Sequence, residues 1–600
     1  MKKIILLIIL IFSALSFNYS YGDDIIQPKY AILVYMNGSD LESEKGEATK
    51  AINEMIKATG NKKFPGVFIV QTGGTKKWHL KELEGSGNQR LIIKDGKIAE
   101  SIEIKSNSMG DTDTFKEFIN FSLSIPADDY MLIFWNHGHG SIKGFGNDEL
   151  YQNDSLTLPE ISEALDNSII TKKFILIGFD TCLMSTIETA NTLSSYGKYM
   201  LASQELENQG GWNYSNFSYL SNNTAIEDFA KNIINDYVAK EQQYSITLWN
   251  LEYVPILVNT INDALLSWNK KYDILSEKML YLRDEMLDFG GNINQKTFNY
   301  IYPDMVDLDD VFRSIPNIES EYKNKYKQAK KLSIIYHAGN GYEKKSSGIN
   351  IYLPYGKTDL SEDMEIYNSL EFSKNYTKFI NKYYELLSYK NKFELDNAPR
   401  FISYNKCRLE IDNESKLNNI YLSIFKPLKY QKYMSFGYIS KNIINKDNII
   451  ESSPDNYWIY GLGNQMLYVI EIDNNTYITP MLLKRDNVES IVNIKFSLNP
   501  ATIISIANIE NDLTVSKTLN NIKEGDFLTP LYPVYKFNEF NKKFIKNLKA
   551  VSYEKGKTYK ILFDNIIGLS YKPYKETYQI RFVFENMYKN KIYSLPCKYY

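Results

Sequence analysis

Two side chains in this sequence have the types and the spacing for nucleophilic catalysis, a cysteine and a histidine. Cys182 lies just after an apolar run at 174–178, and His137 follows a second apolar run at 130–135, about 45 residues earlier. A thiol attacks a carbonyl carbon as its thiolate, and a neighbouring imidazole both lowers the pKa of the thiol and gives a proton to the leaving amine. The pair therefore predicts acyl transfer through a covalent intermediate.

Both apolar runs have the form of buried central strands, each ending in a polar or glycine-containing segment. If the two strands are adjacent and parallel, their carboxyl ends meet at one edge of the sheet, where ligands and catalytic groups collect in open α/β sheets. A strand at 30–36, helical spacing of apolar residues from Ala48 to Ile56 and a strand at 66–72 form a βαβ unit. The sequence thus predicts a mostly parallel sheet flanked by helices.

The remaining elements of this first region follow from the same patterns. We expect a turn at 37–40, a helix ending at Gly60, a hairpin turn at 94–97 and a flexible exposed segment at 141–155 beside the site. Further helices are expected at 112–124, about 185–194 and 370–387 and over most of 255–330, and further strands at 198–203, 244–249, 333–336 and 348–354.

The pattern changes after about residue 390. From 400 to 600 short alternating runs, such as 420–425, 466–472 and 577–584, are separated by Asn, Asp and Gly turns. We therefore predict three parts: a signal peptide at 1–22, an α/β domain at 23–390 and a β-rich carboxyl-terminal domain at 391–600.

The first residues have the form of a secretory signal peptide. Lys2 and Lys3 precede an apolar core at 4–17, and small and polar residues lead to Asp23. Without a cysteine near the cleavage region, a lipoprotein anchor is not expected, and no later segment supplies about 18 uninterrupted apolar residues. The predicted location is therefore outside the cytoplasm: secreted, periplasmic or at the cell surface.

Charge and cysteine content narrow the function further. The chain of 600 residues carries 69 basic and 72 acidic side chains, so no electrostatic signal points to nucleic acid or to an anionic membrane. Of its three cysteines, Cys407 and Cys597 could pair, which leaves Cys182 alone. A lone thiol in an exported protein is either a buried small hydrophobe or a reactive group.

The backbone beside the histidine suits an oxyanion hole. Gly138 lets a peptide N–H approach a substrate oxygen with no Cβ in the way, and the N–H of Cys182 is the second candidate donor.

Four segments together resemble the clostripain family, the C11 cysteine peptidases of the caspase-like clan, in order and in spacing. They are Tyr-Met-Asn-Gly-Ser-Asp-Leu-Glu at 35–42, Trp-Asn-His-Gly at 135–138, Phe-Asp-Thr-Cys-Leu-Met-Ser at 179–185, and Ala-Ser-Gln-Glu at 202–205 with Gly-Trp at 211–212. The resemblance covers about residues 28–390. It implies a caspase-like fold and a secreted cysteine endopeptidase in which His137 is the general base and Cys182 the nucleophile.

The resemblance also implies a specificity. Asp180 matches the acidic position that selects Arg or Lys before the scissile bond, and a carboxylate at the floor of a pocket pairs well with a guanidinium or an ammonium. Glu205 and Glu207 either line the same pocket or are solvated loop charges. Two positions depart from the family pattern: His139 stands where a small residue is common, and the segment after the histidine offers only Lys143 for internal maturation.

Other interpretations of the same residues stay open. Asp180 could instead satisfy backbone amides at a strand end, and Cys182 could be a merely buried thiol. His137 and His139 would need a third ligand to bind zinc, so no metal site is predicted; Asp148, Glu149 and Asp154 could supply ligands to calcium, which some family members require, although their spacing matches no defined loop. The alternative function is a catalytically inactive surface or adhesion protein that binds a partner through its carboxyl-terminal domain.

Overall fold

The structure is a computed structural model of the whole chain. It describes residues 27–600 except 84, 86, 241–243, 269–270, 294–299, 302–303, 340–344, 356–360, 389–398, 404–405, 412–416, 442, 447–448, 453–456, 474, 509–516, 520, 538–543, 547, 549, 565, 574–577, 587–588, 590 and 598–600. The predicted signal peptide at 1–22 and the predicted domain boundary at 390 both lie outside the described residues.

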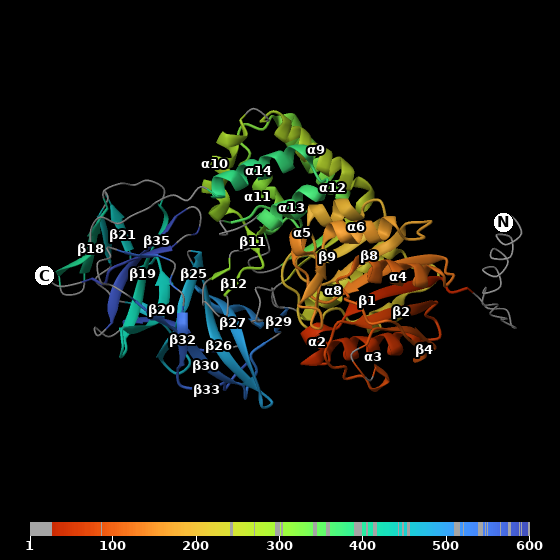
Figure 1. The fold of residues 1–600 in the computed structure, drawn as a ribbon, viewed down its shortest axis with the longest axis horizontal. Coiled ribbons are helices and arrows are strands. Elements are labelled where there is room, and N and C mark those ends of the chain that lie inside the picture. Colours follow the sequence, from red (N-terminus) through yellow and green to blue (C-terminus); the bar gives the residue numbers. More distant parts are fainter. Residues whose placement is uncertain are drawn as a thin grey trace, which may run out of the picture.

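The part of the chain before residue 390, called the first region, has a nine-stranded sheet at its centre, on the right of Figure 1. Its strands lie in the order β15-β10-β9-β8-β5-β1-β2-β3-β4. Their bounds are β1 (Tyr30–Asn37), β2 (Gly66–Gly73), β3 (Gln89–Lys94), β4 (Lys97–Glu103), β5 (Asp129–Trp135), β8 (Phe174–Asp180), β9 (Gly197–Ser203), β10 (Ser245–Asn250) and β15 (Ile334–Gly339). The five central strands from β9 to β2 are parallel and the outer ones antiparallel, which confirms the predicted, mostly parallel sheet.

Helices cover both faces of this sheet. Successive side chains of a strand point to opposite faces, so Leu33 of β1 belongs to one apolar core and its neighbour Val34 to the other. Both are buried, which explains why β1 is apolar throughout instead of alternating. The helices are α2 (Ser39–Ser43), α3 (Glu47–Thr59), α4 (Thr112–Leu123), α5 (Gly140–Lys143), α6 (Leu158–Asp166), α7 (Ile187–Leu193), α8 (Ile226–Lys240), α9 (Val254–Leu266), α10 (Tyr272–Leu282), α11 (Leu308–Ser314), α12 (Ser320–Ser333), α13 (Ser361–Ser369) and α14 (Lys374–Ser388).

The expected turn at 37–40 is wrong. The strand β1 continues through Asn37, and the short helix α2 begins at Ser39. The backbone N–H groups of Gly38 and Ser39 are already bonded to the carbonyl groups of Gly73 and Gly74, so the chain leaves the sheet without a reversal. Asp40 then lies in the first turn of α2, where the helix dipole favours an acidic side chain.

The segment at 141–155, expected to be flexible and exposed, is mostly buried at 141–148 and exposed at 150–154. It forms α5 and a hairpin of β6 (Phe145–Asp148) and β7 (Asp154–Leu156). The Asp148 carboxylate explains the order, because it accepts hydrogen bonds from the backbone N–H groups of Met109 and Leu150, each at 2.8 Å. The sequence did not predict this contact, because the partner Met109 lies 39 residues earlier in the chain.

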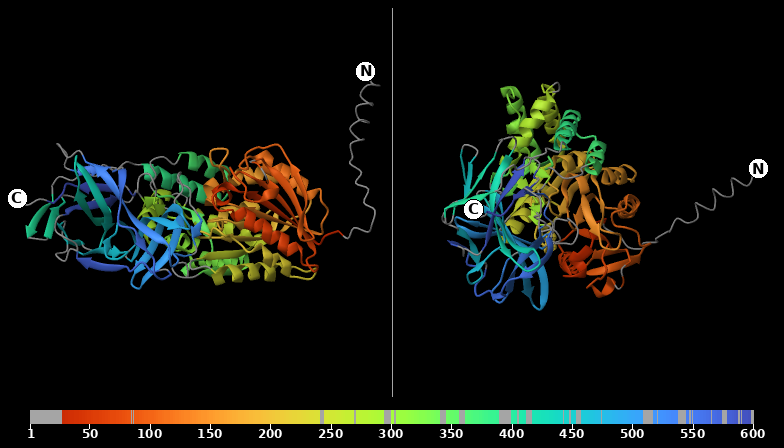
Figure 2. Two further views of the ribbon diagram at one scale, coloured as in Figure 1. Left: turned by 90° about the horizontal axis from the view of Figure 1, so that it is seen from below. Right: turned by 60° about the vertical axis from the view of Figure 1, so that its left-hand side comes forward.

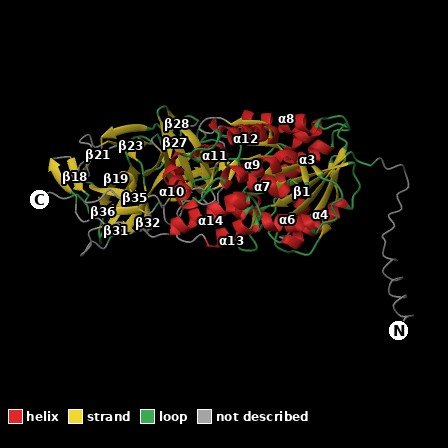
Figure 3. Ribbon diagram, turned by 90° about the horizontal axis from the view of Figure 1, so that it is seen from above, coloured by secondary structure: helices red, strands yellow, loops and turns green. Residues whose placement is uncertain are grey.

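The second region is β-rich, as predicted, and lies beside the first (Figures 1 and 2). Figure 3 shows how the helices gather in one half of the molecule and the strands of this region in the other. Its strands include β18 (Lys406–Glu410), β19 (Leu417–Pro427), β20 (Lys432–Ile439), β25 (Val469–Asp473), β26 (Thr476–Arg485), β27 (Val488–Leu498), β28 (Ala501–Asn508), the two-residue β29 (Thr518–Leu519), β30 (Phe527–Lys536), β32 (Ala550–Lys555), β35 (Gln579–Asn586) and β36 (Lys591–Ser594).

The two regions share a part of their cores. Two short strands of the first region, β12 (Asn292–Ile293) and β13 (Tyr300–Ile301), contribute Ile293 and Tyr300 to the apolar core of the β-rich region. The side chain of Asn493 in β27 donates a hydrogen bond to the carbonyl oxygen of Ile293 at 3.2 Å. The first region thus supports one side of the β-rich region directly.

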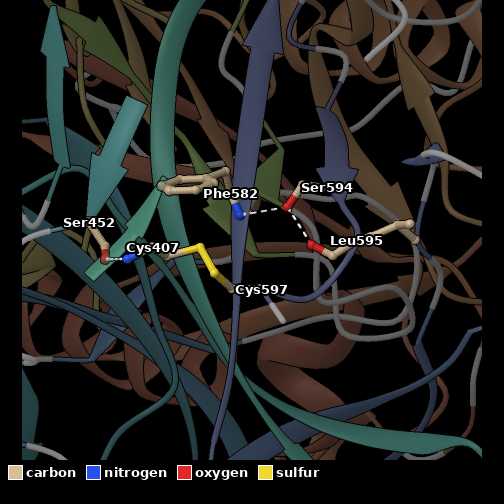
Figure 4. The surroundings of a disulfide bond; sticks show 6 residues. All are labelled: Cys407, Ser452, Phe582, Ser594, Leu595 and Cys597. Carbon is tan, nitrogen blue, oxygen red and sulfur yellow. Dashed lines mark hydrogen bonds between the residues drawn. A yellow bond between two sulfur atoms is a disulfide. The ribbon is translucent and has the colours of Figure 1, made fainter. Parts of the chain in front are cut away.

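A disulfide joins Cys407 to Cys597 (Figure 4). It links β18 to the end of the chain across a sequence separation of 190 residues. The backbone N–H of Cys407 donates to the hydroxyl of Ser452 at 2.9 Å, and the hydroxyl of Ser594 accepts from the N–H of Phe582. The pairing suggested by the cysteine count is thereby confirmed, and Cys182 is left as a free thiol.

Among the described residues, every helix is too short or too polar to cross a lipid bilayer.

Candidate active site

The two predicted catalytic residues lie at the ends of neighbouring strands. Strands β5 and β8 are parallel partners, and Trp135 and Asp180 are their last paired residues. His137 and Cys182 each follow two residues later, at the carboxyl edge of the sheet. The predicted adjacency of the two strands is therefore confirmed.

Gly138 brings the histidine segment against the cysteine segment. A Cβ atom at this position would overlap the carbonyl oxygen of Cys182 and lie 2.7 Å from the Thr181 hydroxyl. A larger residue would force the two segments apart, so the sequence requires glycine here for a close approach of backbones.

The imidazole of His137 has an acidic partner that the sequence interpretation did not assign. Its Nε2 atom lies 2.9 Å from Oδ1 of Asp40, and the histidine side chain is fully buried. Asp40 follows β1, the strand next to β5, so it reaches the same edge of the sheet. The available signal was its place just beyond the end of a neighbouring parallel strand. Because a carboxylate holds Nε2, the orientation of the imidazole ring is fixed, and so is the direction in which Nδ1 points.

Replacing Asp40 by asparagine is expected to lower kcat by about 10- to 100-fold and to change KM little, because general-base catalysis contributes about 10²–10⁴ in total. The exposed neighbour Glu44 provides the matched control, Glu44→Gln, which should keep the wild-type rate. Asp40→Glu should recover part of the loss. A fall in kcat that is equal for the Glu44 variant would contradict a positioning role for Asp40.

The thiol of Cys182 is completely buried in this structure. Its Sγ atom accepts a hydrogen bond from the backbone N–H of Glu207 at 3.1 Å. Burial raises the pKa of the thiol to about 12, against the opposing effect of the nearby Lys517 ammonium. The cysteine is therefore protonated at neutral pH in this closed arrangement, and a substrate has to gain access before it can react.

Asp180 lies at the centre of a buried cluster of polar groups, which is called the Asp180 pocket. Its Oδ2 atom accepts hydrogen bonds from the backbone N–H of Trp212 and from the hydroxyl of Tyr214, both at 3.1 Å. A Cβ atom at Gly211, where φ is +58°, would overlap Oδ1, so that glycine leaves room for the carboxylate. Oδ1 itself lies 3.3 Å from the ammonium of Lys517. Asp180 thus accepts a backbone N–H, as one alternative expected, and also contacts a cation.

Glu205 and Glu207 are both buried, so the alternative that they are solvated loop charges is wrong. Burial, reinforced by the charge of Asp180, raises the pKa of Glu207 well above its ordinary value, so Glu207 belongs to the same pocket. The carboxylate of Glu205 instead accepts from the N–H groups of Leu206 and Gly290, at 2.8 and 3.2 Å. Glu205 therefore binds backbone beside the pocket.

The groups considered for metal binding are engaged elsewhere. Burial lowers the pKa of His139 to about 3, and its Nε2 lies 3.0 Å from Oδ1 of Asn147. Glu149 accepts from the N–H of Lys76 at 3.0 Å, and Asp154 from the hydroxyl of Ser108 at 2.6 Å. Within the part of the chain that the structure describes, no three His, Cys, Asp or Glu side chains gather as a metal site. Calcium remains an untested prediction without an assembled ligand set.

The fold and this edge of the sheet define a cysteine peptidase of the caspase-like type: a mostly parallel sheet that carries a histidine and a cysteine on adjacent strand ends. The sequence matches the clostripain family, Peptidase C11, over residues 34–399. Because this match spans more than half of the chain, the protein belongs to the clostripain family and is a cysteine-type peptidase that acts on proteins or peptides.

Solved structures of C11 proteases are similar to this chain. One is a secreted C11 cysteine protease from Bacteroides thetaiotaomicron in complex with an irreversible peptide inhibitor, at 18% identity over 57% of this chain and 99% of that chain, with a TM-score of 0.44. Another is an inactive zymogen C11 protease from Parabacteroides distasonis, at 18% identity over 59% of this chain and 99% of that chain, with a TM-score of 0.45. A search of curated proteins gave no match.

Proposed function

We propose that this protein is an exported cysteine endopeptidase that cleaves after lysine or arginine, with Cys182 as nucleophile and His137 as general base. The observation that carries this proposal is the buried polar cluster beside Cys182, in which the carboxylate of Asp180 contacts an ammonium group at 3.3 Å. A substrate side chain with the same charge would meet the same carboxylate, and its scissile carbonyl would follow directly along the substrate backbone.

In the proposed mechanism His137 takes the thiol proton, and the thiolate of Cys182 attacks the carbonyl carbon to form a C–S bond. The negative oxygen accepts hydrogen bonds from the N–H groups of Gly138 and Cys182. His137 then donates its proton to the amine as the C–N bond breaks. A water molecule hydrolyses the remaining thioester, which releases the new carboxyl end and restores the thiol.

Labelling of Cys182 tests this proposal. An acyl-lysine chloromethyl ketone should alkylate one thiol, with loss of chloride, and intact-mass measurement should find one added group. Because Lys517 contacts Asp180, the end point is measured on the wild type and on Lys517→Met. His137→Ala in either protein should leave the thiol unlabelled. If none of these proteins reacts, the catalytically inactive partner-binding protein becomes the better description.

Export is supported by the apolar segment at 4–17 and by the Cys407–Cys597 disulfide, because structural disulfides persist mainly in oxidising compartments. The similar protease from Bacteroides thetaiotaomicron is also described as secreted. Amino-terminal sequencing of the protein from the culture medium or cell envelope should find a start near residue 23. A mature chain that retains Met1 would contradict export by this route.

A further inference from the structure

The ammonium group in the Asp180 pocket belongs to the chain itself. Lys517 lies immediately before β29 in the β-rich region, 337 residues after Asp180 in the sequence. Its Nζ atom donates to the carbonyl oxygen of Asp180 at 3.0 Å and lies 3.3 Å from Oδ1. It also lies 5.6 Å from the centre of the Trp135 ring, within the range of a cation–π contact. The pocket therefore holds a lysine side chain by charge, by hydrogen bond and by an aromatic face.

The charges around Lys517 match a protonated lysine. The side chain is fully buried, a condition that lysine tolerates only when it is paired. Burial opposes its charge, but Asp180, Glu207 and Cys182 outweigh burial and raise the pKa of Lys517 above its ordinary value. Asp180 thus provides an acidic partner for a charged ammonium inside the protein.

The strand next to Lys517 packs against the segment that carries the thiol. Ala507 of β28 packs in one apolar cluster with Cys182, Leu183, Leu206 and Phe289. Ala507 of β28 is paired with Thr518 of β29, the residue after Lys517. The packing of Ala507 in the cysteine cluster and the contact of Lys517 with Asp180 therefore both come from the β28–β29 pair. Figure 1 shows β27 and β29 on the side of the β-rich region that faces the first region.

Two further contacts hold this part of the β-rich region in place. Asn493 of β27 binds the carbonyl of Ile293, and the positive charge of Lys495 in the same strand favours the ionised form of the buried Glu205 carboxylate. Strand β27 pairs directly with β28. The contacts that fix β27 on the first region therefore also hold the β28–β29 pair over Cys182.

We propose that Lys517 occupies the primary specificity pocket as a built-in substrate mimic, so that the β28–β29 pair is an intramolecular inhibitor of a lysine-cleaving site. This inference rests on the proposed function and deepens it in two respects. It names lysine as the side chain for which the pocket is built, and it requires that the β28–β29 pair withdraw before a substrate can bind.

The rate at which the acyl-lysine chloromethyl ketone alkylates Cys182 tests the inference in the full chain. A tethered competitor acts at an effective concentration in the millimolar range, so Lys517→Met should react about 100-fold faster than the wild type. Lys517→Arg keeps the charge and should react more slowly than Lys517→Met. The exposed Lys536 of the same region gives the matched control, and Lys536→Ala should also react at the wild-type rate.

A second variant keeps the test valid if Lys517→Met does not fold. Ala507→Trp leaves Lys517 in place but introduces a bulky side chain into the apolar cluster that Ala507 shares with Cys182, and it should also accelerate alkylation by at least about tenfold. The double variant Lys517→Met with His137→Ala should lose the gain, which separates an opened active site from general unfolding.

The possible results separate the inference from the proposed function. Equal alkylation rates for the wild type, Lys517→Met and Ala507→Trp would overturn the inhibitory role and leave the proposed peptidase intact. If Lys517→Met reacts as fast with an acyl-glutamate probe as with the acyl-lysine probe, the pocket does not select lysine and this part of the inference is overturned. If no variant reacts with either probe, the proposed function fails and this inference fails with it.

Discussion

Replacing Cys182 by alanine is expected to abolish peptide cleavage, with a loss of about 10⁵ or more in kcat, because the substitution removes the thiolate that forms the acyl-enzyme. The measurement uses a fluorogenic peptide with lysine before the scissile bond. It is made in the Lys517→Met background, so that an occupied pocket cannot be mistaken for a missing nucleophile. The change removes a single buried sulfur atom that accepts one hydrogen bond, from the N–H of Glu207.

Two controls make this result specific. The circular dichroism spectrum and the thermal midpoint of Cys182→Ala should stay close to those of the parent, since the substitution is small. When the parent Lys517→Met protein is treated with iodoacetamide, its activity should fall in parallel with the alkylation of Cys182. Cleavage of the lysine peptide by Cys182→Ala above the background rate would remove this residue from the mechanism.

Replacing Asp180 by asparagine is expected to lower kcat/KM for a lysine peptide by about 10²–10³. The isosteric amide keeps the size of the side chain but removes the charge that would pair with the substrate ammonium, and a buried charged pair contributes about 2–5 kcal/mol when one partner is removed. The same substitution should leave kcat/KM for a peptide with a neutral residue at this position nearly unchanged. Both peptides are assayed in the Lys517→Met background.

Asp148→Asn provides the matched control for this experiment. Asp148 is also a buried carboxylate, but it binds the backbone N–H groups of Met109 and Leu150, away from the pocket. Its replacement should alter stability without altering the ratio of kcat/KM between the lysine and neutral peptides. If Asp180→Asn leaves that ratio unchanged, Asp180 is a structural group and the basic specificity is wrong.

The pocket also explains why Asp180 and Lys517 have to be studied together. Removing the Asp180 carboxylate alone would take away the acidic group that does most to keep Lys517 charged, and it would weaken the hold of Lys517 on the pocket. The single variant would then lose both substrate recognition and the intramolecular contact. The separate effects of the Asp180 and Lys517 substitutions appear only when each substitution is measured with and without the other.

The sequence by itself determined the edge of the sheet where the site lies. Apolar runs at 130–135 and 174–178 predicted two buried strands, and His137 and Cys182 follow them closely enough that parallel pairing alone brings them together. The sequence assigned Gly138 to an oxyanion hole; the structure adds that a Cβ atom there would overlap the carbonyl oxygen of Cys182. These features are local, because they depend on short periodic patterns and on the common direction of parallel strands.

Only the tertiary structure decided which groups surround the two catalytic candidates. The carboxylate of Asp40 reaches His137 from 97 residues away, and Lys517 reaches Asp180 from 337 residues away. Glu205, which follows the same strand as Glu207, binds the N–H of Gly290 rather than the pocket. No periodicity encodes such contacts. Asp40 meets His137 because β1 pairs with β5, and Lys517 meets Asp180 because the β-rich region packs against the first region. The burial of Cys182 is a result of that packing, so the sequence shows the candidate nucleophile and only the fold shows that it is covered.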